Sequence, residues 1–264
     1  MSLRRNNFSQ QKPGSRIPKA VCFCLFLLCA QLSFAGTTSD FRAANKLYDE
    51  GKFPEAAAAY EKITPKTANV YYNLGNAWFR EGKLGLAILN YERARRLTPR
   101  DPDVLANLRF AEQRLGVEDV NTPPRAIQRF LHSVVVSHTP TEWGAFELVA
   151  LWLTLLAVAG CIFLPRAHTA FLVVAIIGFL GFGASAFALG YEAITRHTAP
   201  QAVVVIDDSE ARFAPLPEST VHFKLAEGTK IVIREDRDQW LLVERADGQQ
   251  GWVKSDAIVP ITPR

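Results

Sequence analysis

Residues that could take part in catalysis are scattered along this chain and do not form a recognisable catalytic pattern. The five histidines share no spacing and never form the HExxH pattern of a zinc enzyme; they are His132, His138, His168, His197 and His222. Neither GxSxG nor GxxxxGK[ST] occurs, so the sequence contains no nucleophile elbow and no phosphate-binding loop of those types. We therefore expect a protein that is not an enzyme and that needs no cofactor.

The four cysteines point the same way. Cys22, Cys24 and Cys29 lie within the first 35 residues, and Cys161 lies in a long apolar run. There is no CxxC pair and no Cys/His cluster with the spacing of metal ligands. We expect no metal site, and no intrachain disulfide once the first 35 residues are removed.

The remaining side chains of chemical interest are suited to recognition, because they offer amide, aromatic and charged groups. They fall in a segment, residues 39–116, whose pattern predicts paired helices. We expect them on one face of the first helix of each pair, where they would line a groove for a partner segment: Asn45, Tyr48, Asp49, Tyr72, Asn76, Phe79 and Arg80. The alternatives are a solvated face or a contact within the chain.

Small and aromatic residues at fixed spacing support these helical pairs. Tyr71, Leu74, Gly75, Tyr91, Ala94 and Pro99 match the tetratricopeptide pattern, and a similar unit with Ala44, Asn45, Gly51 and Ala56 lies 31 residues earlier. Residues 102–115 predict a closing helix. Phe41 stands where tetratricopeptide domains that capture a C-terminal carboxylate need a lysine. Because two repeats bury little surface, we expect a bound partner or the adjacent membrane helix to cover the array.

Two long apolar stretches predict a transmembrane hairpin. Residues 146–164 carry one charge, Glu147, and residues 169–191 carry none. Each is long enough to cross a hydrocarbon core of about 30 Å. Only four residues separate the two stretches, which requires antiparallel helices, and Trp143 and Tyr191 suit the same membrane interface.

The N-terminal segment has the features of an export signal. Residues 1–35 combine five basic residues, no acidic residue, an apolar stretch and a small-residue cleavage site; an uncleaved anchor is the alternative. The rest of the chain has 25 basic and 26 acidic residues, which argues against nucleic-acid binding. Export of the N-terminus places both soluble parts outside a bacterial cytoplasmic (inner) membrane. Residues 125–136 have one apolar helical face, which predicts a helix lying on the membrane or packing on the array.

Residues 201–261 change to short runs rich in valine, isoleucine and tryptophan. Five such runs, separated by turns at Glu227-Gly228 and Asp247-Gly248, predict a small all-β barrel. The string from Glu227 through Trp240 to Gly251-Trp252-Val253 resembles the bacterial SH3 pattern. Trp240 and Trp252 either face a ligand cleft or complete a small core.

The order of leader, tetratricopeptide pair, two-span hairpin and SH3-like domain resembles BatE-type proteins of the Bacteroides aerotolerance operon. The resemblance covers most of residues 36–261. It implies a membrane component that acts beside von Willebrand A-type Bat proteins, with a role in stress or aerotolerance. From the residues alone we expect a membrane-anchored adaptor that holds protein partners on its repeat groove. A membrane anchor that binds peptidoglycan through the SH3-like domain is the alternative.

Overall fold

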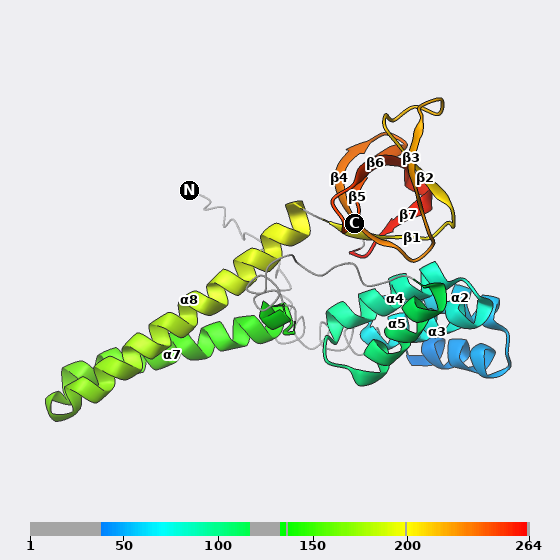
Figure 1. Cartoon of the computed structure of the whole chain (residues 1–264). Coiled ribbons are helices and arrows are strands. Elements are labelled where there is room, and N and C mark those ends of the chain that lie inside the picture. The colour runs from blue at the N-terminus through cyan, green and yellow to red at the C-terminus, as the bar shows by residue number, and fades with distance from the viewer. Residues whose placement is uncertain (1–37, 117–132, 136, 199, 263–264) are drawn as a thin grey trace, which may run out of the picture.

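The computed structural model describes residues 38–116, 133–135, 137–198 and 200–262. It contains a helical array, a β-domain and a long helical hairpin that projects away from the other two (Figure 1). The predicted export signal, residues 1–35, lies outside the described residues. So does most of the predicted amphipathic helix 125–136, of which residues 133–135 are helical.

The array consists of consecutive antiparallel helices. A helix over residues 38–49 is followed by α2 (Phe53–Lys62), α3 (Ala68–Glu81), α4 (Leu84–Leu97) and α5 (Pro102–Leu115). Local sequence sets their ends: the Thr67 hydroxyl accepts a hydrogen bond from the Val70 amide at the start of α3, and Asp101 caps α5 in the same way. Gly82, with φ of 83°, ends α3 in the left-handed region that favours glycine.

Small residues let the helices of the array approach closely. A Cβ atom on Gly75 of α3 would lie 2.7 Å from the ring of Tyr91 of α4, so only glycine fits there. Ala44, Ala56 and Ala87 are fully buried at the equivalent close approaches. The packing expected of the tetratricopeptide pattern is thus present.

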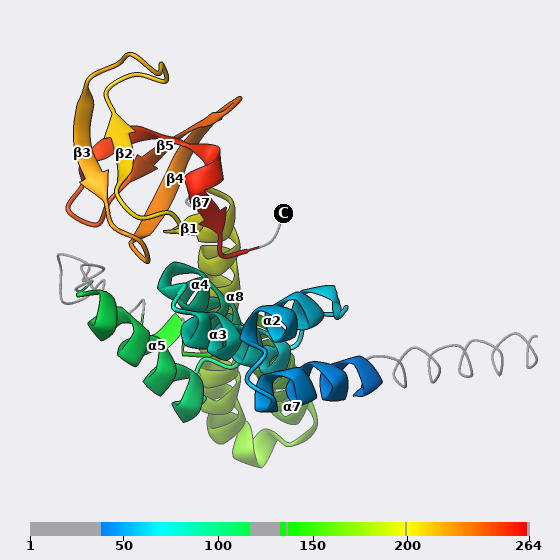
Figure 2. The same cartoon turned by 90° about the vertical axis from the view of Figure 1, so that its right-hand side faces the viewer.

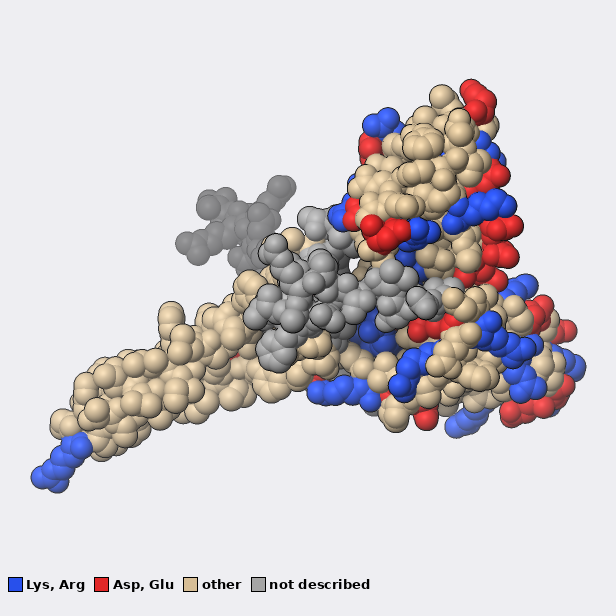
Figure 3. Space-filling view, in the orientation of Figure 1, with Lys and Arg blue, Asp and Glu red and all other residues tan. Residues whose placement is uncertain are grey.

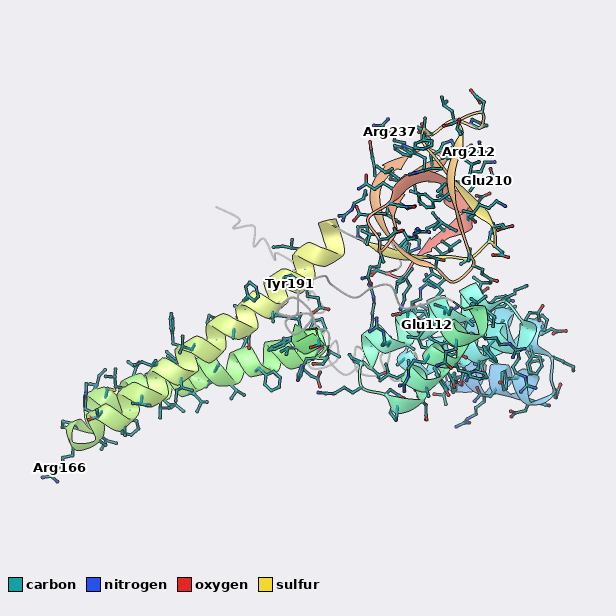
Figure 4. The ribbon with its side chains drawn as sticks, viewed as in Figure 1. Glu112, Arg166, Tyr191, Glu210, Arg212 and Arg237 are labelled. Carbon is teal, nitrogen blue, oxygen red and sulfur yellow. The ribbon has the colours of Figure 1, made fainter. Side chains whose placement is uncertain are left out.

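The hairpin is formed by α7 (Pro140–Phe163) and α8 (His168–Thr198), joined by the short 3-10 helix η1 (Pro165–Ala167). Both helices are longer than the predicted stretches and extend beyond them toward the other two parts. Gly160 packs against Phe171, and Gly178 packs against Thr154, as small-residue contacts between helices require. Both are long and apolar enough to cross a membrane, and most of the apolar side chains of α7 are exposed. Figure 3 shows this part almost free of charge except at its tip, where Figure 4 labels Arg166.

The β-domain is a curled antiparallel sheet of seven strands in the order β3-β2-β6-β5-β4-β1-β7. The strands are β1 (Gln201–Val204), β2 (Ser209–Arg212), β3 (Val221–Leu225), β4 (Lys230–Arg237), β5 (Trp240–Glu244), β6 (Gln250–Lys254) and β7 (Ile258–Pro260). Two of these strands, β2 and β7, were not predicted from the sequence. Both are short, β2 contains Glu210 and Arg212, and β7 ends in a proline, so neither resembles a strand in isolation. The predicted SH3-like all-β fold is confirmed, although β3 and β7 remain the open edges of the sheet.

Candidate functional site

The amides predicted to line the groove are already engaged within the array. Asn45 Oδ1 accepts a hydrogen bond of 2.6 Å from the Tyr60 hydroxyl, and Asn76 Oδ1 accepts one of 2.8 Å from the Tyr91 hydroxyl. Asn107 of α5 donates to Asn76 Oδ1 at 2.9 Å and to the Tyr72 hydroxyl at 3.0 Å. These bonds connect neighbouring helices, so Asn45, Asn76 and Tyr72 help to hold the array together.

Burial keeps the two tyrosine donors in their protonated form. Loss of water around the ring raises the pKa of Tyr60 to about 12 and also raises the pKa of Tyr91. Both hydroxyls therefore stay hydrogen-bond donors across the physiological pH range. An alanine at Asn45 or Asn76 would leave a buried hydroxyl without its acceptor, which couples any binding role of these amides to stability.

Aromatic and charged residues form the more accessible part of the same face. The Arg80 guanidinium lies 4.7 Å from the centre of the Phe53 ring, which also contacts Tyr48 edge-on. The Phe79 ring lies 5.5 Å from that of Phe110, and Phe110 is 55% exposed. Asp49 is exposed as well. We call this surface the first-helix face: Tyr48, Asp49, Phe79, Arg80, Phe110 and Arg114.

Two members of the first-helix face were missed by sequence analysis. Phe110 and Arg114 lie on α5, which we had treated only as a closing helix. The signal was present, because Tyr48, Phe79 and Phe110 follow one another at the 31-residue interval of the repeat, as do Asn45, Asn76 and Asn107. Extending the interval once more would have placed α5 in the binding face.

The opposite side of the array is covered by the β-domain. One continuous apolar cluster connects the two parts. In it the apolar side chains of α4, including Ile88 and Leu89, pack against Val203, Val205, Val259 and Ile261 of the β-domain. Figure 2 shows β1 and β7 facing α4. This corrects our expectation that a partner or a membrane helix covers the array, because the chain's own β-domain packs beside α4 and α5, where a further helix would continue the solenoid.

Buried charged residues also connect the array with the β-domain. We call this group of residues the polar seam: Glu92, Arg95, Glu112 and Lys230. Glu92 of α4 is 1% exposed, and its carboxylate lies 2.7 Å from Arg95 and 3.1 Å from the Lys230 ammonium of β4. The same ammonium lies 2.8 Å from Glu112 of α5. Burial alone would raise the pKa of Glu92, but the charges of Arg95 and Lys230 and their hydrogen bonds lower it below its ordinary value.

Further polar contacts extend the seam on both sides. Arg93 donates to the carbonyl oxygens of Pro260 and Ile261, at 2.8 and 3.1 Å, and the Gly85 amide donates to Glu227 at 2.7 Å. Sequence analysis could not find this seam. Glu92 and Lys230 are 138 residues apart, and each alone resembles an ordinary surface charge.

The two tryptophans of the β-domain are both largely buried, at 9% and 8% exposure for Trp240 and Trp252. Neither belongs to the inner cluster of the sheet, which is built from side chains such as Leu241, Val243 and Val253. The Arg237 guanidinium lies 5.2 Å from the centre of the Trp252 ring. Trp240 lines a cavity of about 290 Å³ with two cations, Arg212 and Lys254, and with four carboxylates: Asp207, Asp208, Glu210 and Asp256. Arg212 forms an ion pair with Glu210.

The described residues offer surfaces for binding. Among residues 38–116, 133–135, 137–198 and 200–262, no three His, Cys, Asp or Glu side chains are grouped to hold a metal ion. Cys161 is a free thiol in α7. The first-helix face and the cavity at Trp240 are two candidate binding sites.

Comparison with known families identifies the array and the β-domain. Residues 44–82 match the TPR repeat model, residues 68–101 match the tetratricopeptide repeat model, and residues 209–259 match the bacterial SH3 domain model. No curated protein matches the chain. The chain thus contains TPR repeats and a bacterial SH3 domain, which confirms both predicted modules. The similarity to BatE-type proteins stays a prediction.

Proposed function

We propose that this protein is a non-catalytic adaptor, anchored in a membrane by α7 and α8, that holds a protein partner on its first-helix face. TPR repeats suggest binding of proteins, and the two apolar helices suggest membrane association. One observation carries the proposal: the α4 side of the array is used by the bacterial SH3 domain, whereas the first-helix face has an exposed aromatic centre flanked by Arg80 and Arg114.

The composition of the first-helix face favours a peptide segment with apolar and acidic side chains. Phe110 and Phe79 offer an apolar contact of the kind that dominates interface energy. Arg80 and Arg114 offer guanidinium groups that bind carboxylates. A von Willebrand A-type Bat protein is the partner that the resemblance suggests, within a complex for stress or aerotolerance.

The test uses variants that leave the hydrogen bonds of the asparagine side chains in the array intact. Full-length protein with Arg80→Ala and Phe110→Ser is compared with a matched control, Arg109→Ala and Phe213→Ser, which changes an exposed arginine and an exposed aromatic residue elsewhere. Partners cross-linked in native membranes are identified by mass spectrometry. We expect the first variant to lose a partner that the control keeps; retention of every partner by both would contradict the proposal.

The proposed orientation has both soluble modules outside the cytoplasmic membrane. An exported N-terminus makes α7 run inward and α8 outward, which leaves Arg166 on the cytoplasmic side as the positive-inside rule favours. Alkaline phosphatase fused after Arg264 should be active, and the same enzyme inserted at Ala167 should be inactive. The reverse pattern would contradict this orientation.

Peptidoglycan binding by the bacterial SH3 domain is the second candidate, because such domains suggest cell-wall binding. The cavity beside Trp240 favours it, since its four carboxylates together with Arg212 and Lys254 offer both charges to a ligand with amino and carboxyl groups. Sedimentation of the full chain with insoluble peptidoglycan tests it. The whole chain is needed because the isolated domain would expose Val203 and Ile261. Loss of sedimentation in Asp256→Asn, but not in Asp238→Asn, would support this second function.

A further inference from the structure

A second cavity, of about 490 Å³, lies where the array, the start of α7 and the end of the β-domain meet. The array contributes Lys66, Tyr71, Arg93 and Arg96, α7 contributes Pro140 and Thr141, and the β-domain contributes residues of its last strand region. Three cationic side chains thus line one cavity, and no carboxylate is among its lining residues. Figure 3 shows blue atoms on the part of the array that faces the hairpin.

Two of the three cations, Lys66 and Arg93, donate to backbone carbonyl oxygens. Lys66 donates to the backbone carbonyl of Glu61 at 2.6 Å, and Arg93 donates to the carbonyls of Pro260 and Ile261. Within the described part of the chain, neither Lys66 nor Arg93 forms a salt bridge. Burial lowers the pKa of both groups, and the negative charge of Glu61 opposes this shift at both without reversing it. Glu61 is not among the residues that line the cavity, so an anion inside the cavity would stabilise these half-buried positive charges further.

The position of the cavity along α7 indicates where that anion comes from. Pro140 and Thr141 form the first turn of α7, and the exposed apolar band of the helix begins at Phe146. Six residues of α-helix span about 9 Å. The headgroup layer on each side of the hydrocarbon core is about 5–8 Å thick. With α7 along the bilayer normal, Pro140 lies just beyond the headgroup layer and Thr141, about 7.5 Å from Phe146 along the helix, lies near its outer limit. The membrane side of the cavity therefore borders the layer that holds the lipid phosphates.

We propose that this cavity binds the phosphate of an anionic phospholipid headgroup. Lys66 and Arg93 supply the charge, and the Thr141 hydroxyl supplies a hydrogen-bond donor at the membrane side. The bound phosphate lies where the array, the β-domain and α7 meet, so it connects the array and the β-domain to the membrane hairpin.

The test compares lipid retention by the full chain in nanodiscs that contain equal amounts of phosphatidylglycerol and phosphatidylcholine. After extraction, bound lipids are counted by native mass spectrometry. We expect the wild type to retain phosphatidylglycerol preferentially, and Lys66→Glu and Thr141→Glu each to retain at least fivefold less. Lys62→Glu, an exposed site four residues from Lys66 with the same change in charge, is the control and should behave as wild type. Circular dichroism checks the folding of each variant.

Two results would overturn the lipid site: equal retention of the two lipids by the wild type, or an equal loss in Lys62→Glu and Lys66→Glu, which would indicate diffuse attraction. Short-chain phosphatidylglycerol and inorganic phosphate are also titrated onto detergent-solubilised protein. The lipid should bind at least tenfold more tightly; equal affinities would assign the cavity to soluble phosphate and contradict the lipid source. The inference rests on the proposed membrane insertion. A chain that fails to enter nanodiscs contradicts both, whereas one that enters without lipid preference contradicts only the lipid site.

Discussion

The Lys230 ammonium is shared by Glu92 and Glu112, two carboxylates that belong to the other domain, and its side chain is only 15% exposed. Removing it leaves the buried Glu92 with Arg95 alone and takes from Glu112 the ammonium that lies 2.8 Å away. We expect Lys230→Met to lower the free energy of unfolding by about 3–5 kcal/mol, the usual effect of breaking a buried pair from one side. Denaturant titration of the full chain in detergent measures this.

Arg234 on the same strand provides the matched control. It pairs with Glu244 through two hydrogen bonds, but this pair lies on the surface of the β-domain. We expect Arg234→Met to change stability by less than about 1 kcal/mol. Equal losses in the two variants would show that the seam between the domains contributes no more than a surface ion pair.

Glu92 also predicts how stability depends on pH. Its pKa in the folded chain is lowered from the ordinary value of 4.5, so its contribution to stability is complete above that value and is lost as the pH falls through the lower, folded pKa. We expect the stability of Glu92→Gln to fall less steeply than that of the wild type below about pH 4.5. Glu55→Gln, on an exposed turn of α2, should keep the wild-type slope, and a wild-type slope in Glu92→Gln would contradict the prediction. Thermal unfolding across pH 3–6 measures the slopes.

At the scale of the elements, contact between α7 and α8 depends on glycines that have no room for a side chain. A Cβ atom at Gly178 would lie 2.5 Å from Thr154 Oγ1 and 3.1 Å from the Thr154 amide, whereas one at Gly183 would meet nothing within 4 Å. We expect Gly178→Val to destabilise the hairpin by about 1–3 kcal/mol and Gly183→Val to do so by much less. Unfolding in detergent measures the stability of the two variants. Equal stability would show that the helices can move apart without loss of free energy and would contradict the prediction.

The elements also show how far sequence could predict this structure. Helices, hairpin and most strands were predictable, because periodicity, glycine turns and long apolar runs are local signals. The docking of the bacterial SH3 domain was not, because Val203 and Ile261 look like ordinary core residues of their own domain. The roles of Asn45 and Asn76 were also missed, since an amide that faces a groove and one that bonds a neighbouring tyrosine look the same in sequence.

At the scale of the whole molecule, the array and the β-domain are in close contact at two glycines, Gly85 facing a backbone carbonyl and Gly228 facing side chains. A Cβ atom at Gly85 of α4 would lie 2.8 Å from the Val204 carbonyl oxygen, and one at Gly228 would lie 2.5 Å from Leu115. We expect Gly85→Leu to separate the two domains while each keeps its fold. Hydrogen exchange should rise at β1, β7 and the outer face of α4 and stay unchanged in α2. Ala106→Leu, an exposed helical site on α5, is the control; unchanged exchange in Gly85→Leu would show that the contact can adjust.

The β-domain that covers α4 is made after the array and after both long helices, and this sets an order of events during synthesis. The array is complete at Gly116, but β1 begins only at Gln201, after both long helices. At about 5–20 residues per second the ribosome needs about 4–17 s to make the segment between them. During that interval Ile88, Leu89 and Glu92 have no cover, so the newly made array presents an apolar surface to chaperones and proteases. A chain truncated before β1 would keep that surface exposed, because Val203 and Ile261 would be missing from the cluster that covers it.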